Sequence, residues 1–204
     1  MSDEKAVIKL LRRMGFTSNT FLETIALVLN GEGNVVNVLP LGIKLSRGRL
    51  YARVFKGSRT YEALKKGVIR RGVICITQDA KLFYLSIFKK NEAIEAITEE
   101  SACDAAVDFN VDSIHMGKEY IAIYLKPIAI RMLRKIPRGF SRAPALIIEA
   151  LVWLTKLPYV DEIKRREYIS YIRYCIEGIY RSSKSRVYRN IAKEIYEALH
   201  TKAT

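Results

Sequence analysis

The chain has few of the side chains on which most hydrolytic and metal-dependent active sites depend. Its 204 residues include only two histidines, His115 and His200, and neither has partners at the spacing of a zinc site. Ser-His-Asp or Cys-His chemistry therefore has little support. We expect no metal site and identify no catalytic residue, so the sequence leaves open whether the protein is an enzyme.

Cysteine is scarce as well. The three cysteines, Cys75, Cys103 and Cys175, lie far apart in the sequence. An odd number of cysteines in a chain that shows no export signal argues against a disulfide framework. We therefore expect three buried thiols.

Long apolar runs are also missing. No stretch of about 18 apolar residues occurs without a charge, and the strongest candidate, residues 143–154, is short and contains Glu149. The first residues, Met-Ser-Asp-Glu-Lys, are acidic where a secretory signal is basic. We expect no membrane span and a cytoplasmic location.

Positive charge is what the sequence has in excess. The formal net charge is +14, and residues 126–204 hold 17 Lys and Arg against 7 acidic residues. Such a field attracts polyanions, including RNA, DNA and phosphorylated small molecules, without choosing among them. A charged surface of the kind found in heat-adapted proteins explains the same composition.

Residue patterns predict a β-barrel followed by helices. Alternating and β-branched runs predict six strands, at residues 21–29, 35–45, 50–55, 71–77, 105–111 and 120–130. Helical spacing predicts three C-terminal helices, at residues 143–157, 162–181 and 187–199. We place a boundary near residue 137, so that residues 1–137 form the barrel domain with a short N-terminal helix and residues 138–204 form a three-helix region packed on it.

The segment Lys56-Gly57-Ser58-Arg59-Thr60 joins a predicted strand to a predicted helix. A helix N-terminus exposes unpaired amides, glycine lets a ligand approach the backbone, and the hydroxyl and basic side chains suit a phosphate monoester. The spacing does not match a nucleotide triphosphate loop. An ordinary helix capped by Ser58 accounts for the same residues.

A second motif lies within the second predicted strand. Pro40 and Gly42 are expected to interrupt the ladder and bend this strand, which leaves backbone groups free beside Asn37. A flat isoalloxazine ring needs such a platform. A bulge at a barrel corner explains the motif equally well.

Taken together, the order and spacing of these motifs resemble a known family. The resemblance rests on Glu23-Thr-Ile-Ala-Leu, Asn30-Gly-Glu-Gly-Asn, Phe55-Lys-Gly-Ser-Arg-Thr-Tyr, Thr77-Gln-Asp-Ala-Lys-Leu-Phe-Tyr, Asp104-Ala-Ala-Val-Asp and Phe140-Ser-Arg-Ala-Pro-Ala. The chain is similar in these segments to domain-of-unknown-function family 447, mostly archaeal proteins of unassigned activity that are related in fold to flavin reductases. The resemblance covers about residues 20–160, and Gly-Ser-Arg-Thr-Tyr is its most specific block.

The resemblance implies an FMN-binding split barrel that forms a homodimer, with the flavin at the subunit boundary. By position, Gly57, Ser58, Arg59 and Thr60 would meet the FMN phosphate and ribityl chain, beside the charge of Lys56. The ring side would be lined by Asn37, Pro40 and Gly42. The implied activity is that of a flavin-dependent oxidoreductase or flavin reductase-like protein whose substrate and electron donor are unknown.

Two departures from the family pattern leave an alternative open. Ala63 and Cys75 stand where the family commonly has asparagine. A chain that had lost its flavin would be a nucleic-acid-binding or interaction protein on the same barrel. Its nucleic-acid surface would lie on the basic C-terminal helices, where tyrosines alternate with arginines.

Overall fold

The computed structural model describes residues 4–18, 21–133, 142–183 and 185–201. The chain divides into two compact units. Unit 1 comprises Met1–Thr77 and Ser86–Ile136, and unit 2 comprises Gln78–Leu85 and Pro137–Thr204.

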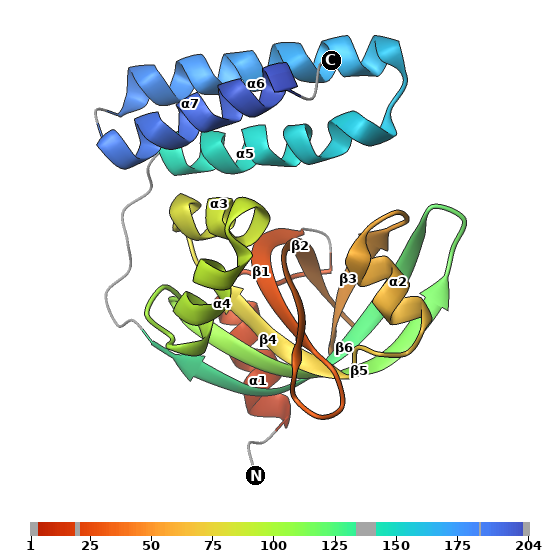
Figure 1. Cartoon of the computed structure of the whole chain (residues 1–204). Coiled ribbons are helices and arrows are strands. Elements are labelled where there is room, and N and C mark those ends of the chain that lie inside the picture. Colours follow the sequence, from red (N-terminus) through yellow and green to blue (C-terminus); the bar gives the residue numbers. More distant parts are fainter. Residues whose placement is uncertain (1–3, 19–20, 134–141, 184, 202–204) are drawn as a thin grey trace. The chain divides into compact units, whose positions relative to one another are not determined.

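Unit 1 is built on a closed barrel of six antiparallel strands (Figure 1). The strands are β1 (Leu22–Leu29), β2 (Val35–Ser46), β3 (Arg49–Phe55), β4 (Arg71–Ile76), β5 (Ala105–Met116) and β6 (Tyr120–Met132). Their order around the barrel is β1-β2-β3-β6-β5-β4, and β4 pairs with β1 to close it. The predicted architecture, a six-stranded β-barrel with added helices, is confirmed.

Side-chain alternation along the strands explains the core. In β3, Leu50, Ala52 and Val54 are buried in the barrel interior, whereas Tyr51 and Arg53 between them face outward. This period of two is what a strand with one buried face requires. The outer face of β3 is therefore free to carry polar and aromatic groups.

The expected break in the second strand is wrong. β2 runs without interruption, and its ladder with β1 passes through the pairs Ile25–Pro40 and Glu23–Gly42 with no register shift. The irregularity lies instead at Val28 and Leu29. Pro40 is accommodated because β3 pairs with β2 only from Ile43 to Ser46, and proline is tolerated on a strand edge that has no partner.

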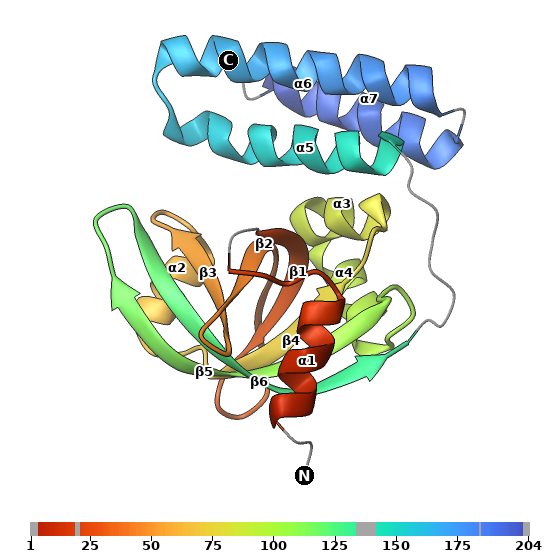
Figure 2. The same cartoon turned by 180° about the vertical axis from the view of Figure 1, so that it is seen from behind.

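Three helices accompany the barrel in unit 1. Helix α1 (Glu4–Arg13) lies against β6 and buries Val7 and Leu11 (Figure 2). Helix α2 (Arg59–Lys65) contributes Tyr61 and Leu64 to the barrel core. Helix α4 (Lys90–Thr98) was not predicted from the sequence, which indicated only an alanine-rich connection there.

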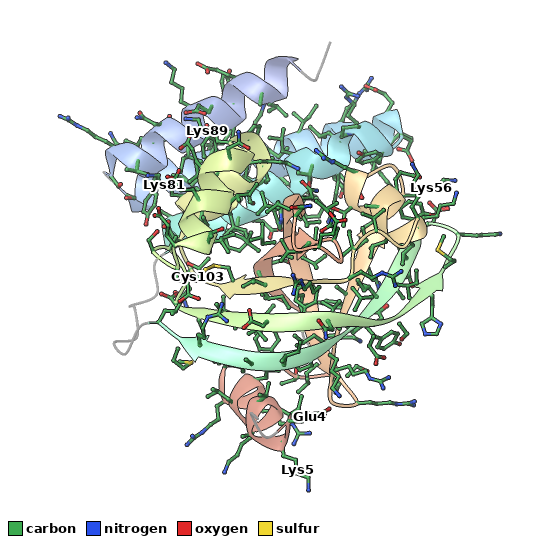
Figure 3. All side chains as sticks on the ribbon, turned by 60° about the horizontal axis from the view of Figure 1, so that its bottom comes forward. Glu4, Lys5, Lys56, Lys81, Lys89 and Cys103 are labelled. Carbon is green, nitrogen blue, oxygen red and sulfur yellow. A yellow bond between two sulfur atoms is a disulfide. The ribbon has the colours of Figure 1, made fainter. Side chains whose placement is uncertain are left out.

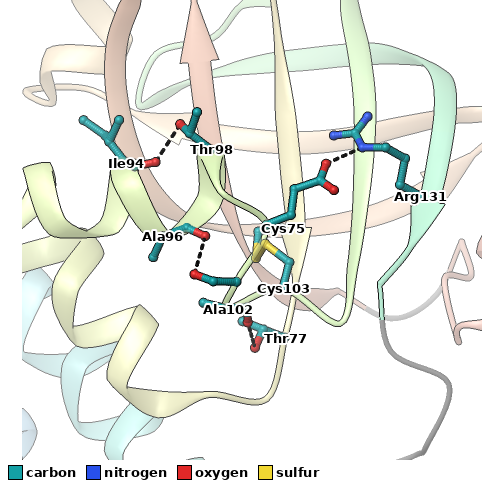
Figure 4. Close-up of a disulfide and its surroundings, with 10 residues drawn as sticks. Cys75, Thr77, Ile94, Ala96, Thr98, Ala102, Cys103 and Arg131 are labelled. Atoms are coloured by element: carbon teal, nitrogen blue, oxygen red, sulfur yellow. Dashed lines mark hydrogen bonds and ion pairs between the residues drawn. A yellow bond between two sulfur atoms is a disulfide. The ribbon is translucent and has the colours of Figure 1, made fainter.

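The expectation of three free thiols is also wrong. Cys75 of β4 and Cys103 form a disulfide with a Cα–Cα distance of 5.4 Å, and both are buried (Figure 4). Counting cysteines missed the pair because the segment that contains α4 returns the chain to the end of β4. Beside the disulfide, Thr77 Oγ1 donates a hydrogen bond to the carbonyl of Ala102, at 3.1 Å. Cys175 alone remains a free, buried thiol.

Unit 2 is helical. It contains most of α3 (Ala80–Phe88) together with α5 (Arg142–Lys156), the 3-10 turn η1 (Leu157–Tyr159), α6 (Glu162–Ser182) and α7 (Arg186–Thr201). Helices α5, α6 and α7 pack on one another through aliphatic side chains, and Tyr84 of α3 donates a hydrogen bond to Glu194 of α7. In the described part of the chain, no helix is long and apolar enough to cross a membrane.

Candidate functional site

The junction between β3 and α2 is a capped helix start. Gly57 has φ of 88°, in the left-handed region that glycine adopts without strain. Ser58 Oγ accepts a hydrogen bond from the amide of Tyr61 at 3.1 Å and donates to the carbonyl of Phe55 at 3.0 Å. The Ser58 hydroxyl is thus engaged in capping and in closing the turn.

Asn37 lies at the meeting point of three elements. From β2 its amide nitrogen donates to Thr60 Oγ1 of α2 at 2.8 Å, and its amide oxygen accepts from Lys90 Nζ of α4 at 2.6 Å. Asn37 and Thr60 are both buried, being 7% and 2% exposed. Because a buried polar side chain is costly unless it is hydrogen-bonded, these two bonds fix the geometry of the cluster.

The amino group of Lys90 is partly buried and lies near a second cation, Arg59, so its charged form is disfavoured. Burial is the largest cause that lowers the pKa of its amino group from 10.5, and the nearby Arg59 guanidinium lowers this pKa further. Within the residues that the structure describes, no carboxylate forms an ion pair with Lys90 or Arg59. Two cations that repel each other and lack a counter-ion form a site that an anion would stabilise.

Beside this cluster, β2 has an open edge. The stretch Val35–Gly42 is paired with β1 on one side, and β3 pairs only from Ile43 onward. No other strand among the described residues pairs with this edge, which includes half-buried Pro40 and Gly42. Main-chain groups along this edge have no strand partner in the described ranges, so a ligand that has its own donors and acceptors could pair with them.

The structure brings together only part of the predicted set of site residues. Asn37 and Thr60 are in direct contact, and Arg59 is close enough to Lys90 to affect its pKa. Lys56 and Gly57 are exposed, and Lys56 projects from the end of β3 (Figure 3). Pro40 and Gly42 lie farther along β2 from Asn37, on its open edge.

Lys90 was missed by the sequence analysis. Its only local signal is a pair of lysines, Lys89 and Lys90, before an acidic segment, which is too common to indicate a site. Lys89 is exposed and forms a loose ion pair with Glu92 at 3.9 Å. The same dipeptide thus supplies one surface lysine and one lysine directed to Asn37, and only the position of α4 separates the two roles.

The two departures from the family pattern have different outcomes. Cys75 is held in the disulfide with Cys103, so it offers no polar group to a ligand. Ala63 is half-buried and packs against the barrel core. Neither position contributes to the hydrogen-bonded cluster around Asn37.

Two tyrosines of the C-terminal helices are engaged within unit 2. Tyr168 and Tyr171 pack on Trp153 with ring centroids 4.7 and 5.2 Å apart. Several basic residues of these helices are paired one turn away, as in Arg166–Glu162 and Arg181–Glu177. No group of three or more potential metal ligands occurs among the described residues.

Comparison with known proteins places these features in a family. Residues 22–134 match the family model described as "Protein of unknown function (DUF447) N-terminal domain", which confirms the resemblance inferred from the motifs. None of the curated proteins matches the chain.

Solved structures resemble the chain to different extents. A crystal structure of an FMN-bound protein from Methanosarcina mazei, assigned to the same family model, has a TM-score of 0.68 and 23% identity, and the match covers 92% of this chain and 100% of that one. An FMN-binding protein from Thermus thermophilus with bound 1-cyclohex-2-enone has a TM-score of 0.42 and 12% identity, over 57% and 73% of the two chains. The flavin reductase HpaC complexed with NADP+ has a TM-score of 0.42 and 13% identity, over 65% and 89%.

Proposed function

The chain belongs to the DUF447 family, and on this premise we propose that it is a flavoprotein that binds FMN at the cluster around Asn37 and along the open edge of β2. The observation that carries the proposal is the pair of unneutralised cations, Lys90 and Arg59, beside the buried Asn37–Thr60 hydrogen bond. The relative from Methanosarcina mazei is FMN-bound, which supports the choice of anion.

The donor set fits a phosphate monoester. Lys90 and Arg59 supply charge-assisted donors, and the exposed backbone at Gly57 lets the phosphate approach the chain. Ser58 contributes less than the sequence indicated, because its hydroxyl already serves Tyr61 and Phe55. We therefore assign the phosphate to Arg59, Lys90 and the amides near Gly57, with Asn37 and Thr60 holding Lys90 in place.

The ring side of the site lies along β2. The open edge from Asn37 to Gly42 offers main-chain donors and acceptors that suit the pyrimidine end of an isoalloxazine. Pro40 interrupts the row of donors and presents an apolar surface at that edge. When bound, the flavin would supply hydride transfer, so the protein itself needs chiefly to bind and orient it.

The proposed activity is that of a flavin-dependent oxidoreductase or flavin reductase-like protein. The substrate and the electron donor are left unassigned.

We also propose that the protein acts as a homodimer. An open strand edge that carries one face of a flavin leaves the other face in water, and a second subunit would cover it. Sedimentation velocity with and without FMN tests this, with a dimer expected in the FMN-loaded sample and a monomer there as the contrary result.

The test of the proposed function is an absorption spectrum after the purified protein has been incubated with FMN and freed of excess by gel filtration. We expect retained flavin absorbance in the wild type and in Lys89→Gln, and loss of most of it in Lys90→Gln. Lys89 is the matched control because it is the adjacent lysine and is exposed. A wild-type protein that retains no flavin would contradict the proposal.

A further inference from the structure

The outer face of the barrel carries a cluster of aromatic rings and cations that the proposed flavin site does not use. We call it the aromatic-cationic face. Its central members are Phe21, Lys44, Tyr51, Arg53, Tyr120 and Tyr124.

Strand register explains why these side chains share one face. Tyr51 of β3 is paired with Lys44 of β2 on one side and with Tyr124 of β6 on the other. Directly paired residues project on the same side of a sheet, so the three form a row across three strands. Phe55 and Tyr120 form a second paired row on the same face, four residues from Tyr51 along β3 and four residues from Tyr124 along β6.

The rings form a connected path. Ring centroids are 6.1 Å apart for Phe21 and Tyr51, 5.3 Å for Tyr51 and Tyr124, and 5.5 Å for Tyr124 and His115. Phe55 is 60% exposed and Phe21 is 38% exposed. Large aromatic side chains held together in water are costly to leave uncovered, so the path is suited to a flat, apolar ligand surface.

The cations of this face lie over the rings. Lys44 Nζ is 5.2 Å from the centroids of both Phe21 and Tyr51, and the Arg53 guanidinium is 5.1 Å from that of Tyr120. Arg53 Nε also donates a hydrogen bond to Tyr51 Oη at 3.1 Å. In the described ranges neither cation is ion-paired with a carboxylate.

The face is therefore positive as well as aromatic. At its margin one basic residue, Arg49, forms an ion pair with Asp112 at 3.1 Å, whereas Lys44 and Arg53 have no ion-pair partner in the part of the chain that the structure describes. A second copy of the chain is a less suitable partner, because an interface made by this face on both subunits would contain four such cations, Lys44 and Arg53 from each.

We propose that the aromatic-cationic face binds single-stranded nucleic acid. Unpaired bases stack on exposed aromatic rings whatever their sequence, while Lys44 and Arg53 meet the phosphates. A duplex fits less well, since its bases are stacked inside and unavailable to the rings. The side chains of this face are not those assigned to the FMN phosphate, but Phe21 lies beside Gly42 on the open edge of β2. The protein is therefore tested both free of FMN and saturated with it.

The test is fluorescence anisotropy with a labelled oligouridylate of about 12 nucleotides, a length that spans one barrel face. We expect binding that weakens between about 50 and 200 mM KCl, and that persists when the protein is saturated with FMN. A labelled oligothymidylate and a duplex of the same length are the comparison ligands. Similar affinity for the two single strands and weaker affinity for the duplex are expected.

Two variants locate the site. Tyr51→Leu should weaken binding by about tenfold or more, since one stacking contact is lost. Tyr174→Leu is the matched control, because Tyr174 is a 62% exposed tyrosine on α6 in unit 2, and it should leave the affinity unchanged. Arg53→Gln, at an exposed position, should lower the slope of log affinity against log salt by about 0.7.

Three results would overturn the proposal. One is a wild-type protein that fails to bind the oligouridylate at the lowest salt concentration. Another is a loss of affinity in Tyr174→Leu with none in Tyr51→Leu and Arg53→Gln. The third is a wild-type dimer that Tyr51→Leu and Arg53→Gln convert to monomers, which would assign this face to a second copy.

Discussion

At the scale of single residues, the protein depends on a few buried polar contacts. Asn37 is the clearest case, since both ends of its amide are used, one by Thr60 and one by Lys90. These two hydrogen bonds give Asn37 a role in the stability of the fold as well as in the site. Its loss would leave a buried hydroxyl and a half-buried ammonium without their partner.

We expect Asn37→Ala to lower the free energy of unfolding by about 2 kcal/mol, because the groups left behind lose their hydrogen bonds. Urea denaturation measures this, with Asn110→Ala as the control, since Asn110 is exposed on β5. The control should change stability by less than about 0.5 kcal/mol. Equal effects at the two positions would show that the bonds to Thr60 and Lys90 contribute nothing.

Lys90 makes FMN affinity depend on pH. In the free protein, burial first and Arg59 second hold the pKa of Lys90 below 10.5. A bound phosphate favours the charged ammonium and raises this pKa again, so binding takes up a proton between the two values. FMN affinity should therefore be constant at lower pH and fall as pH rises through the lowered pKa of the free protein.

Titration calorimetry of FMN over this pH range measures the effect. In Lys90→Gln the affinity should be lower and the fall due to this group should be absent, whereas Lys89→Gln should behave as the wild type does. A wild-type profile that matches the Lys90→Gln profile would exclude contact between Lys90 and the phosphate.

At the scale of elements, two structural features hold the strands and the α4 segment in place. One is the close packing of β4 between its neighbours, and the other is the closure of the segment between β4 and β5. This segment is tied by the disulfide (Figure 4) and by Arg131, which contacts both Glu100 and Asp108. Both features act on the part of the barrel that presents Lys90.

Gly72 permits the close packing of β4. A Cβ atom there would lie 2.3 Å from the carbonyl oxygen of Leu27 and 2.6 Å from Phe109 Cζ. Gly72→Ala should therefore cost about 3 kcal/mol or more in unfolding free energy. Gly48→Ala is the control, since its Cβ would meet nothing within 4 Å and only its φ of 79° opposes alanine, at about 1–2 kcal/mol. Thermal denaturation that ranks Gly48→Ala as the more harmful would contradict this packing.

The disulfide closes a segment with a sequence separation of 28 residues. Restricting a loop of this size in the unfolded chain is worth about 3–4 kcal/mol, so Cys75→Ala/Cys103→Ala should lose that amount in urea denaturation. A thiol assay supplies the control. The denatured, unreduced wild type should show one reactive thiol, from Cys175, and three after reduction. Three thiols before reduction would refute the bond.

In the native protein Cys175 should not react at pH 8. Burial raises the pKa of this thiol to about 11, and Glu149 adds to the shift. The thiolate is the reactive form, so its population is very small at that pH. Rapid labelling of the native protein would contradict the burial of Cys175 in α6.

At the scale of the whole molecule, the barrel was predictable and the site was only partly so. Some strands alternate with period two, as β3 does, and others are apolar runs, as in β1, where residues 24–28 are all buried. Both patterns depend on local sequence, which is why all six strands were found. The continuity of β2 through Pro40 was missed because it depends on where β3 stops pairing. Helix α4, the disulfide and the role of Lys90 share one cause, since all follow from how residues 86–104 pack against the barrel.

In the site, too, the features that depend on local sequence were predictable and those that depend on tertiary structure were not. The contact between Asn37 and Thr60 joins residues from two predicted motifs, which family resemblance alone had grouped. The engagement of Ser58 in capping was present in the sequence as the simpler interpretation. What no local pattern contains is the approach of a lysine from α4, because it requires the tertiary arrangement.

Recognition of the FMN phosphate by Lys90 and Arg59 is the central claim, and a comparison of FMN with riboflavin tests it most directly. Calorimetric titration should show that the wild type and Lys89→Gln bind FMN about 10- to 100-fold more tightly than riboflavin, as expected for one or two charge-assisted hydrogen bonds. In Lys90→Gln the two affinities should become similar. Equal affinity of the wild-type protein for FMN and riboflavin would contradict the account.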